Sequence, residues 1–144
     1  MGELLFRPME DDQVTVVVDL WKNCGLIAPQ NDPFRDLALA RGKASSDVLV
    51  GMLDETLVSA IMVGHDGHRG SFYYVAVAPR FQRRGHGAAT VRAGEAWLAE
   101  RGVWKVNLLV RNQNAAVKNF YERLGYVIDP VFSMGRRFIA ASPQ

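Results

Sequence analysis

Gln82-Arg83-Arg84-Gly85-His86-Gly87 stands between a strand-like run at residues 71–77 and a helix-like run at residues 88–101. The two glycines let the backbone turn tightly and approach a ligand closely. The free amides in the first turn of the following helix, at its positive dipole end, suit a phosphate or pyrophosphate group. The two arginines add charge that can pair with phosphate oxygens. The stretch is therefore predicted to be a pyrophosphate cradle.

Two familiar phosphate-binding patterns do not match this stretch. A Walker loop requires Gly-Lys-Ser/Thr after the turn, and none follows. The dinucleotide fingerprint requires a third glycine and an acidic residue about 20 residues later, where this chain has Asn107. The remaining pattern, Gln-x-x-Gly-x-Gly between a strand and a helix, resembles the coenzyme A signature of the GCN5-related N-acetyltransferases (GNAT). The resemblance implies a coenzyme A pyrophosphate site formed by Gln82, Arg83, Arg84, Gly85, His86, Gly87 and Ala88.

A second segment supports the same resemblance. Residues 104–110 are predicted to form a strand, and residues 115–124 a helix that ends before Gly125. The stretch from Asn114 to Tyr126 is similar to the second coenzyme motif of the family. The resemblance implies that Asn114 holds the pantetheine arm and that Tyr121 stands beside the thioester sulfur. The two motifs together cover residues 71–128 and imply acetyl-coenzyme A as the acyl donor.

The predicted order of elements is βααβββαβαβ, with a further strand at the end. Alternating apolar residues predict strands at 4–7, 48–53, 57–63, 71–77 and 104–110, and a final pair around 127–128 and 134–139. Helical periodicity predicts helices near 12–24, 34–42, 88–101 and 115–124. The expected fold is mixed α/β (α+β): a twisted, mostly antiparallel sheet of six to seven strands with helices on both faces. Residues 1–144 are expected to form one N-acetyltransferase domain.

Composition narrows the class of protein. With 49% hydrophobic and 22% charged residues, the chain has the composition of a soluble globular protein. A net charge of +2 gives no surface for nucleic acid or membrane. The single cysteine, Cys24, excludes an intramolecular disulfide, and no signal or membrane segment is recognised, so a cytoplasmic location is expected. His65 and His68 lack a third ligand at suitable spacing, so no metal site is predicted.

Acetyl transfer to an amine needs a donor for the developing oxyanion and an acid for the departing thiolate. By resemblance, the backbone of Val75, Ala76 and Val77 contacts the pantetheine arm, and the Val75 amide points at the thioester oxygen. Tyr121 is the candidate acid, because a phenol with a pKa of about 10 is protonated at neutral pH. A purely structural role for Tyr121, in the core beside Phe120, is the alternative.

The general base is not identified by the sequence. Many relatives carry a glutamate on the strand corresponding to residues 71–77 or on the next one, and this chain has none there. Relatives that acetylate ribosomal-protein N-termini have a glutamate where Leu109 stands, which argues against peptide N-termini as the substrate. The proton of the amine could instead pass through ordered water to Tyr73, Tyr74, Asp66 or His68, and these four alternatives stay open.

Substrate recognition is expected between the first and second strands and in the turn at 66–70. Candidates in the first region are Trp21, Asn31 and Asp32, although Trp21 also fits the apolar stripe of a helix and Asp32 also fits a helix cap. Candidates around the second region are Asp66, His68, Arg69 and Tyr73. Together with Asn31-Asp32-Pro33, this turn is similar to that of the YpeA-like bacterial acetyltransferases, a resemblance over nearly the whole chain that implies no particular substrate.

The leading hypothesis is an acetyl-coenzyme A-dependent N-acetyltransferase that uses direct attack in a ternary complex, more readily on a small-molecule amine than on a protein. Two alternatives stay open: a coenzyme A-binding sensor that has lost turnover, and a peptide N-terminal acetyltransferase. A homodimer is possible, since dimers are common among relatives. No nucleic-acid or membrane partner is expected.

Overall fold

Four antiparallel strands form the sheet within residues 2–139, the part of the chain that the computed structural model describes. Their order in space follows their order in the chain: β1 (Leu5–Pro8), β2 (Ser46–Leu53), β3 (Thr56–His65) and β4 (Gly70–Val77). The two hairpins lie where the sequence predicts them. In the second, Asp66 Oδ1 accepts hydrogen bonds from the amides of His68 (2.9 Å) and Arg69 (2.8 Å), which closes the turn.

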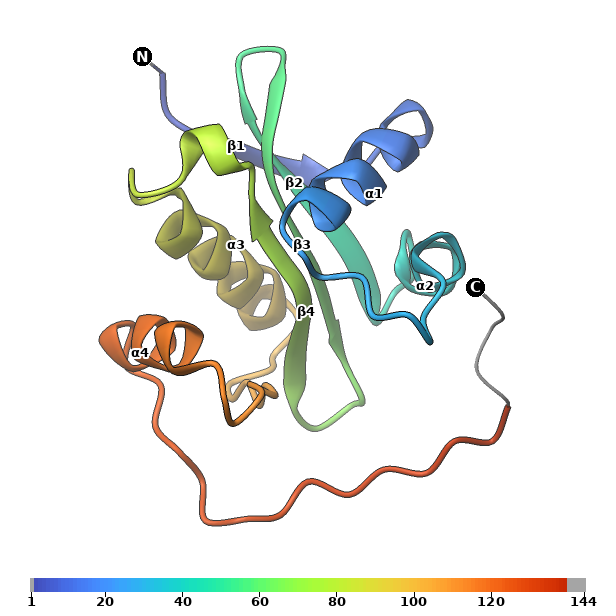
Figure 1. Cartoon of the computed structure of the whole chain (residues 1–144), viewed down its shortest axis with the longest axis vertical. Helices are drawn as coiled ribbons and strands as arrows, with labels where there is room; N and C mark the ends of the chain where they lie inside the picture. The colour runs from blue at the N-terminus through green and yellow to red at the C-terminus, as the bar shows by residue number, and fades with distance from the viewer. Residues whose placement is uncertain (1, 140–144) are drawn as a thin grey trace.

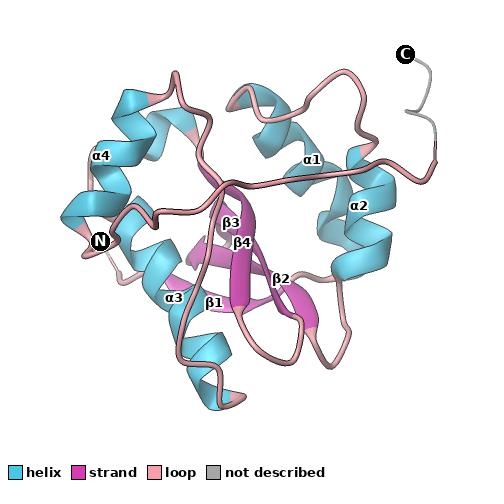
Figure 2. Cartoon of the chain, turned by 90° about the horizontal axis from the view of Figure 1, so that it is seen from below, coloured by secondary structure: helices cyan, strands magenta, loops and turns pink. Residues whose placement is uncertain are grey.

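Helices cover both faces of this sheet, as predicted (Figures 1 and 2). A short 3-10 turn, η1 (Asp11–Gln13), leads into α1 (Val14–Asn23), which lies with α2 (Pro33–Ala40) on one face. After β4, the 3-10 turn η2 (Pro79–Phe81) leads to α3 (His86–Glu100), which lies with α4 (Ala115–Arg123) on the other. None of the helices between residues 2 and 139 has both the length and the apolar character needed to cross a bilayer.

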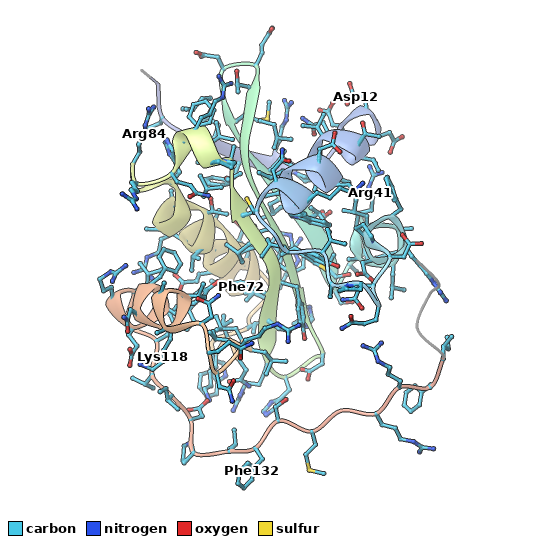
Figure 3. All side chains as sticks on the ribbon, in the orientation of Figure 1. Asp12, Arg41, Phe72, Arg84, Lys118 and Phe132 are labelled. Carbon is cyan, nitrogen blue, oxygen red and sulfur yellow. The ribbon has the colours of Figure 1, made fainter. Side chains whose placement is uncertain are left out.

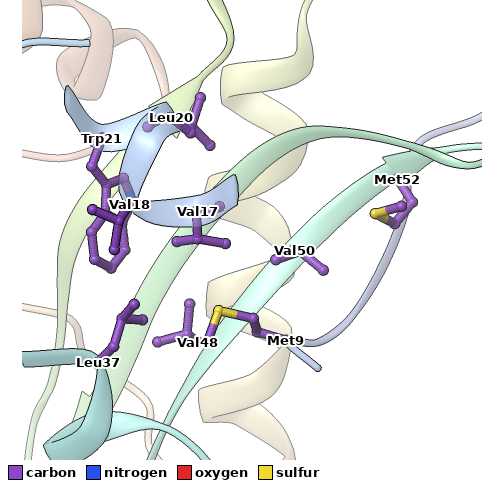
Figure 4. Close-up of a cluster of buried hydrophobic side chains, with 11 residues drawn as sticks. Met9, Val17, Val18, Leu20, Trp21, Leu37, Val48, Val50 and Met52 are labelled. Carbon is purple, nitrogen blue, oxygen red and sulfur yellow. The ribbon is translucent and has the colours of Figure 1, made fainter. Parts of the chain in front are cut away.

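The apolar stripe of α1 forms one half of the core (Figure 4). Val17, Val18 and Trp21 are completely or almost completely buried, and they pack with Leu37 of α2 against Val48 on the sheet. Burying each such side chain contributes roughly 1.5–3 kcal/mol. The periodicity in the sequence therefore identifies this face of the core correctly.

Helix α3 approaches the sheet closely at Gly94, in the second half of the core. A Cβ built on Gly94 would lie 2.7 Å from Phe72 Cε1 and 2.8 Å from Ile61 Cδ1, and both of these side chains are buried. Real carbon atoms do not approach so closely, so a larger residue must displace these buried side chains or α3 itself.

We expect Gly94→Val to destabilise the fold by about 3 kcal/mol, the upper end of the cost of overpacking a core. The melting temperature should fall by about 10 °C for a chain of this size. Gly135→Ala is the control, because Gly135 has nothing within 4 Å of an added Cβ and its φ is not positive. A Gly94→Val melting temperature equal to that of the wild type would mean that α3 is not held against the sheet.

The prediction of six to seven strands is wrong for the described residues. In place of the strand expected at 104–110, a single parallel bridge joins Gly70 to Val106. The Gly70 amide donates to the Lys105 carbonyl (2.9 Å), and the Asn107 amide donates to the Gly70 carbonyl (2.8 Å). A bulge in β4 follows at Tyr74 and Val75. The two segments therefore pair at one position, near the start of β4 and before its bulge.

The strands expected around 127–128 and 134–139 are also absent from the described residues. An ion pair between Lys105 Nζ and Asp129 Oδ2, 3.1 Å apart, fixes the start of this segment. The segment then runs along the outside of the molecule (Figures 1 and 3). Phe132 is 97% exposed and Met134 is 93% exposed. A strand forms only beside another strand whose backbone N–H and C=O groups are free to pair with it. Residues 104–110, the expected neighbour, are not themselves a strand of the sheet. Alternation in the sequence cannot reveal that missing partner.

Candidate active site

A short turn after β4 anchors the predicted cradle to the end of that strand. The Phe81 amide donates to the Ala78 carbonyl (2.8 Å), forming η2. The Gln82 side chain then folds back, and its Nε2 donates to the Val77 carbonyl (2.9 Å). The first residue of the cradle therefore fixes the turn relative to β4.

Left-handed backbone conformations shape the turn that follows. Gly85 has φ of 83° and is the N-cap of α3, without a side-chain hydrogen bond to the helix. Arg83 also has a positive φ, 64°, which is uncommon for a residue with a side chain. The first helical hydrogen bond runs from the Ala89 amide to the Gly85 carbonyl (3.2 Å). The amides of His86, Gly87 and Ala88 thus occupy the first turn of α3, where helices leave their N–H groups free for an anion.

Positive charge collects around the same turn. Arg83 and Arg84 are exposed, and Arg84 projects from the turn at the end of the sheet (Figure 3). The guanidinium groups of Arg80 and Arg84 lie 4.6 and 5.8 Å from the centre of the Phe81 ring. His86 Nε2 is buried and has no hydrogen-bond partner within residues 2–139. An anionic ligand here would meet both guanidinium charge and free N–H groups.

Helix α4 meets the cradle at Gly87. A Cβ on Gly87 would lie 3.2 Å from Phe120 Cε1 and 3.9 Å from Val77 Cγ2. The absence of a side chain therefore lets α3, the end of β4 and α4 come together. Tyr121 follows Phe120 directly, so the candidate acid lies on the helix that packs against the cradle.

Tyr121 is 8% exposed and belongs to the core cluster beneath α3. Its ring packs edge-on against Phe120 and Tyr126, with centroids 5.0 and 5.3 Å away. Burial raises the pKa of Tyr121 to about 12, so the phenol is protonated at neutral pH. It also borders a cavity of about 830 Å³ between residues 105–112 and 126–131. Tyr121 therefore packs in the core, the alternative that the sequence left open, and also lines this cavity.

Asn114 caps α4, as its residue type predicts. Its Oδ1 accepts a hydrogen bond from the Val117 amide (3.1 Å), while the side chain stays exposed. Cap and ligand contact are compatible, because the side-chain NH2 group is a separate donor.

The two groups of substrate candidates occupy different places. Trp21 is fully buried, with its ring stacked on Tyr74, so its surface is not available to a substrate. Asp32 caps α2 by accepting from the amides of Phe34 (3.0 Å) and Arg35 (3.3 Å), whereas Asn31 is exposed. Asn31 and Asp32 both lie on the face of the sheet that α1 and α2 cover.

In the second group, Asp66, His68 and Arg69 lie in the turn before β4, and Tyr73 lies on β4 itself. Hydrogen bonds from the amides of Arg69 and His68 lower the pKa of Asp66. The Arg69 guanidinium lies 4.5 Å from the centre of the Trp104 ring, and Tyr73 is 52% exposed. This turn precedes β4, whereas the cradle follows the other end of that strand. The turn therefore lies beside Trp104 and not beside the cradle. Within residues 2–139, no three His, Cys, Asp or Glu side chains gather as a metal site.

Sequence reasoning missed one side chain near β4, that of Asp36. Tyr74 Oη donates to Asp36 Oδ2 at 2.7 Å. Asp32 and Asp36 are four residues apart, and this spacing puts them on one face of α2. That spacing could have drawn attention to Asp36, although the sequence does not show that α2 faces Tyr74. Cys24, the residue that ends α1, donates from Sγ to the Val77 carbonyl (3.3 Å), and burial raises its pKa.

Comparison with known proteins adds relatives over most of the chain. A family model described as the acetyltransferase (GNAT) family matches residues 14–126. A protein of Yersinia pestis (strain Pestoides F) named an acetyltransferase is 37% identical over 133 residues, which are 92% of this chain and 94% of that protein. An acetyltransferase of Pectobacterium atrosepticum has the same identity and coverage.

Solved structures share the fold at lower identity. AAC(6')-Iy in complex with the bisubstrate analogue CoA-S-monomethyl-acetylneamine has a TM-score of 0.78 and 16% identity, and the match covers 94% of this chain and 99% of that one. The ribosomal-protein-S18-alanine N-acetyltransferase of Escherichia coli has a TM-score of 0.73 and 20% identity, covering 85% and 76%. At these identities the likeness concerns the fold alone.

Proposed function

Because this chain belongs to the acetyltransferase (GNAT) family and is an acyltransferase, we propose that it transfers an acetyl group from acetyl-coenzyme A to a primary amine. The amine attacks directly in a ternary complex. A small-molecule amine is the favoured substrate, because a net charge of +2 gives no docking surface for a basic protein tail. Relatives that acetylate ribosomal-protein N-termini carry a glutamate where this chain has Leu109, and this departure supports the same preference.

The observation that carries this proposal is the cradle at the start of α3. Gly85 leaves the first-turn amides without a side-chain cap, and the neighbouring arginines supply positive charge. This arrangement suits the pyrophosphate of coenzyme A, for which Arg84 is our favoured side-chain partner. The NH2 group of Asn114 and the backbone of residues 75–77 would hold the pantetheine arm.

The bound cosubstrate supplies an activated acyl group as a thioester. Attack by the amine puts negative charge on the carbonyl oxygen, and the Val75 amide is proposed to stabilise it by hydrogen bonding. As the C–S bond breaks, Tyr121 is proposed to give its phenolic proton to the departing sulfur, while the attacking nitrogen loses a proton to solvent water, from which the phenol is restored. Its buried position supports this role, because the raised pKa keeps the proton available at neutral pH.

Thiol release from acetyl-coenzyme A tests this function. The assay uses a panel of primary amines: 1,4-diaminobutane, lysine, an aminoglycoside and a peptide with an N-terminal alanine. We expect amine-dependent release with a small amine and slower release with the peptide. Binding of acetyl-coenzyme A without release on any amine would favour a coenzyme A sensor, and the absence of both would overturn the proposal.

We expect Arg84→Ala to weaken acetyl-coenzyme A binding about tenfold, since one charged hydrogen bond contributes about 1.5 kcal/mol. The loss should be larger at low salt, because screening already weakens this interaction at high salt. Titration calorimetry at two salt concentrations measures both effects.

The matched control is Arg35→Ala, which removes an exposed arginine from α2 on the opposite face of the sheet. Its affinity and salt dependence should equal those of the wild type. Equal affinities for Arg84→Ala and the wild type would remove Arg84 from the cradle.

A further inference from the structure

Tyr74 has an unusual backbone conformation in the middle of β4. Its φ is 55°, a left-handed value that is unfavourable for any residue with a side chain. Tyr74 and Val75 together face the single residue Ile61 of β3, between the pairs Met62–Tyr73 and Ala60–Ala76. Such strain persists only where surrounding contacts impose it.

Two contacts hold the Tyr74 side chain from the α1–α2 face. Its ring stacks on Trp21 with centroids 4.0 Å apart and planes 14° apart, and Trp21 itself is fully buried. Its hydroxyl donates to Asp36 Oδ2 at 2.7 Å. The ring and the hydroxyl are thus fixed by different helices, which leaves the side chain little freedom.

Helix α2 is a firm support for the second contact. Asp32 caps its first turn, Pro33 occupies its first position, and Leu37, next to Asp36, is 1% exposed. The phenol remains a donor, because burial and then the hydrogen bond to Asp36 raise the pKa of Tyr74. The link between α2 and β4 is therefore intact across the neutral pH range.

We propose that the Tyr74–Asp36 hydrogen bond is a strut that holds the bulge of β4 and so orients the Val75 amide for acetyl transfer. Tyr74 and Asp36 are then positioning residues, and the acyl group is stabilised through Val75. The inference rests on the proposed function, in which the Val75 amide stabilises the oxyanion. It gives a role to the carboxylate of Asp36 without making it a base.

Three single variants, one double variant and one control test the strut. Tyr74→Phe keeps the stacked ring and removes the hydroxyl, while Asp36→Ala removes the acceptor. Asp36→Asn keeps a carbonyl oxygen that can still accept the hydrogen bond. Tyr126→Phe is the control, because it removes a tyrosine hydroxyl that donates to a different carboxylate, Glu95 of α3 (2.7 Å).

We expect Tyr74→Phe and Asp36→Ala each to lower kcat for thiol release about tenfold, and the double variant to lower it by no more, since both remove one interaction. The acetyl-coenzyme A affinity should stay within about twofold of the wild type. Asp36→Asn should recover most of the rate, and Tyr126→Phe should match the wild type. An unchanged kcat in Tyr74→Phe, or losses that multiply in the double variant, would overturn the inference.

A readout independent of turnover separates this inference from the proposed function. Asp36 contacts β4 through the hydroxyl of Tyr74, the chain neighbour of Val75, so the backbone amide resonance of Val75 in Asp36→Ala reports on the strut without any turnover. We expect that resonance to move in Asp36→Ala and to stay in place in Asp36→Asn. An unmoved resonance in Asp36→Ala overturns the strut even if the enzyme acetylates amines. A moved resonance in a protein without acetyl transfer would retain the strut and refute the proposed function.

Discussion

Replacing Tyr121 with phenylalanine is expected to lower kcat about 100-fold, the lower end of what a positioned general acid contributes. The phenylalanine ring keeps the edge-on packing against Phe120 and Tyr126 and removes only the hydroxyl. Acetyl-coenzyme A should therefore bind with an affinity close to that of the wild type. Single-turnover rates of thiol release, with calorimetry for binding, separate the two quantities.

The pH dependence sharpens this prediction. Because burial raises the pKa of Tyr121 to about 12, the acid is protonated at every pH from 6 to 9. No loss of kcat in that range should come from its titration. Tyr126→Phe is the matched control: it removes a hydroxyl that donates to Glu95 (2.7 Å) beside the same core and should leave kcat unchanged. Equal rates for Tyr121→Phe and the wild type would assign Tyr121 to the core alone.

Gly85→Val is expected to weaken acetyl-coenzyme A binding at least 100-fold. A valine at φ of 83° costs roughly 1–2 kcal/mol in backbone strain, and relief of that strain moves the first-turn amides of α3 away from a bound pyrophosphate. In the protein without ligand, no atom lies within 4 Å of a Cβ added at Gly85. The loss should therefore appear mainly in ligand binding, measured by calorimetry, with a smaller change in melting temperature.

Gly102→Val controls for backbone strain. Gly102 has a comparable φ of 81° and equally open space around it, but it follows the C-terminal end of α3, whereas Gly85 precedes the N-terminal end. It should lose similar stability and keep its affinity. If Gly85→Val binds acetyl-coenzyme A as well as Gly102→Val does, the turn is not the pyrophosphate site.

Local chemistry in the sequence predicts a large part of this structure. The spacing of Val17, Val18 and Trp21 identifies the buried face of α1, and Asp32 and Asn114 cap the helices that follow them. The strand, glycine turn and helix around Gly85 lie where the pattern predicts them. Each of these features depends on residues within a few positions of one another.

Features that depend on distant partners could not be predicted in the same way. Residues 104–110 have the alternation of a strand, yet they pair with β4 only at Gly70. Phe132 and Met134 have the apolar character of a core, yet they lie outside it. The contact between Asp36 and Tyr74 joins positions 38 residues apart through the packing of α2, which no local pattern encodes.

The most direct test of the central claim is the thermal shift of the wild-type protein with acetyl-coenzyme A, with coenzyme A, and with ATP as a polyanion control. Ligand at about 100 times its dissociation constant adds roughly 2.7 kcal/mol of stability, which for a chain of this size raises the melting temperature by several degrees. A rise with both coenzyme A species and none with ATP is the predicted result. An unchanged melting temperature at millimolar acetyl-coenzyme A would contradict the cradle, and with it the proposed acetyl transfer.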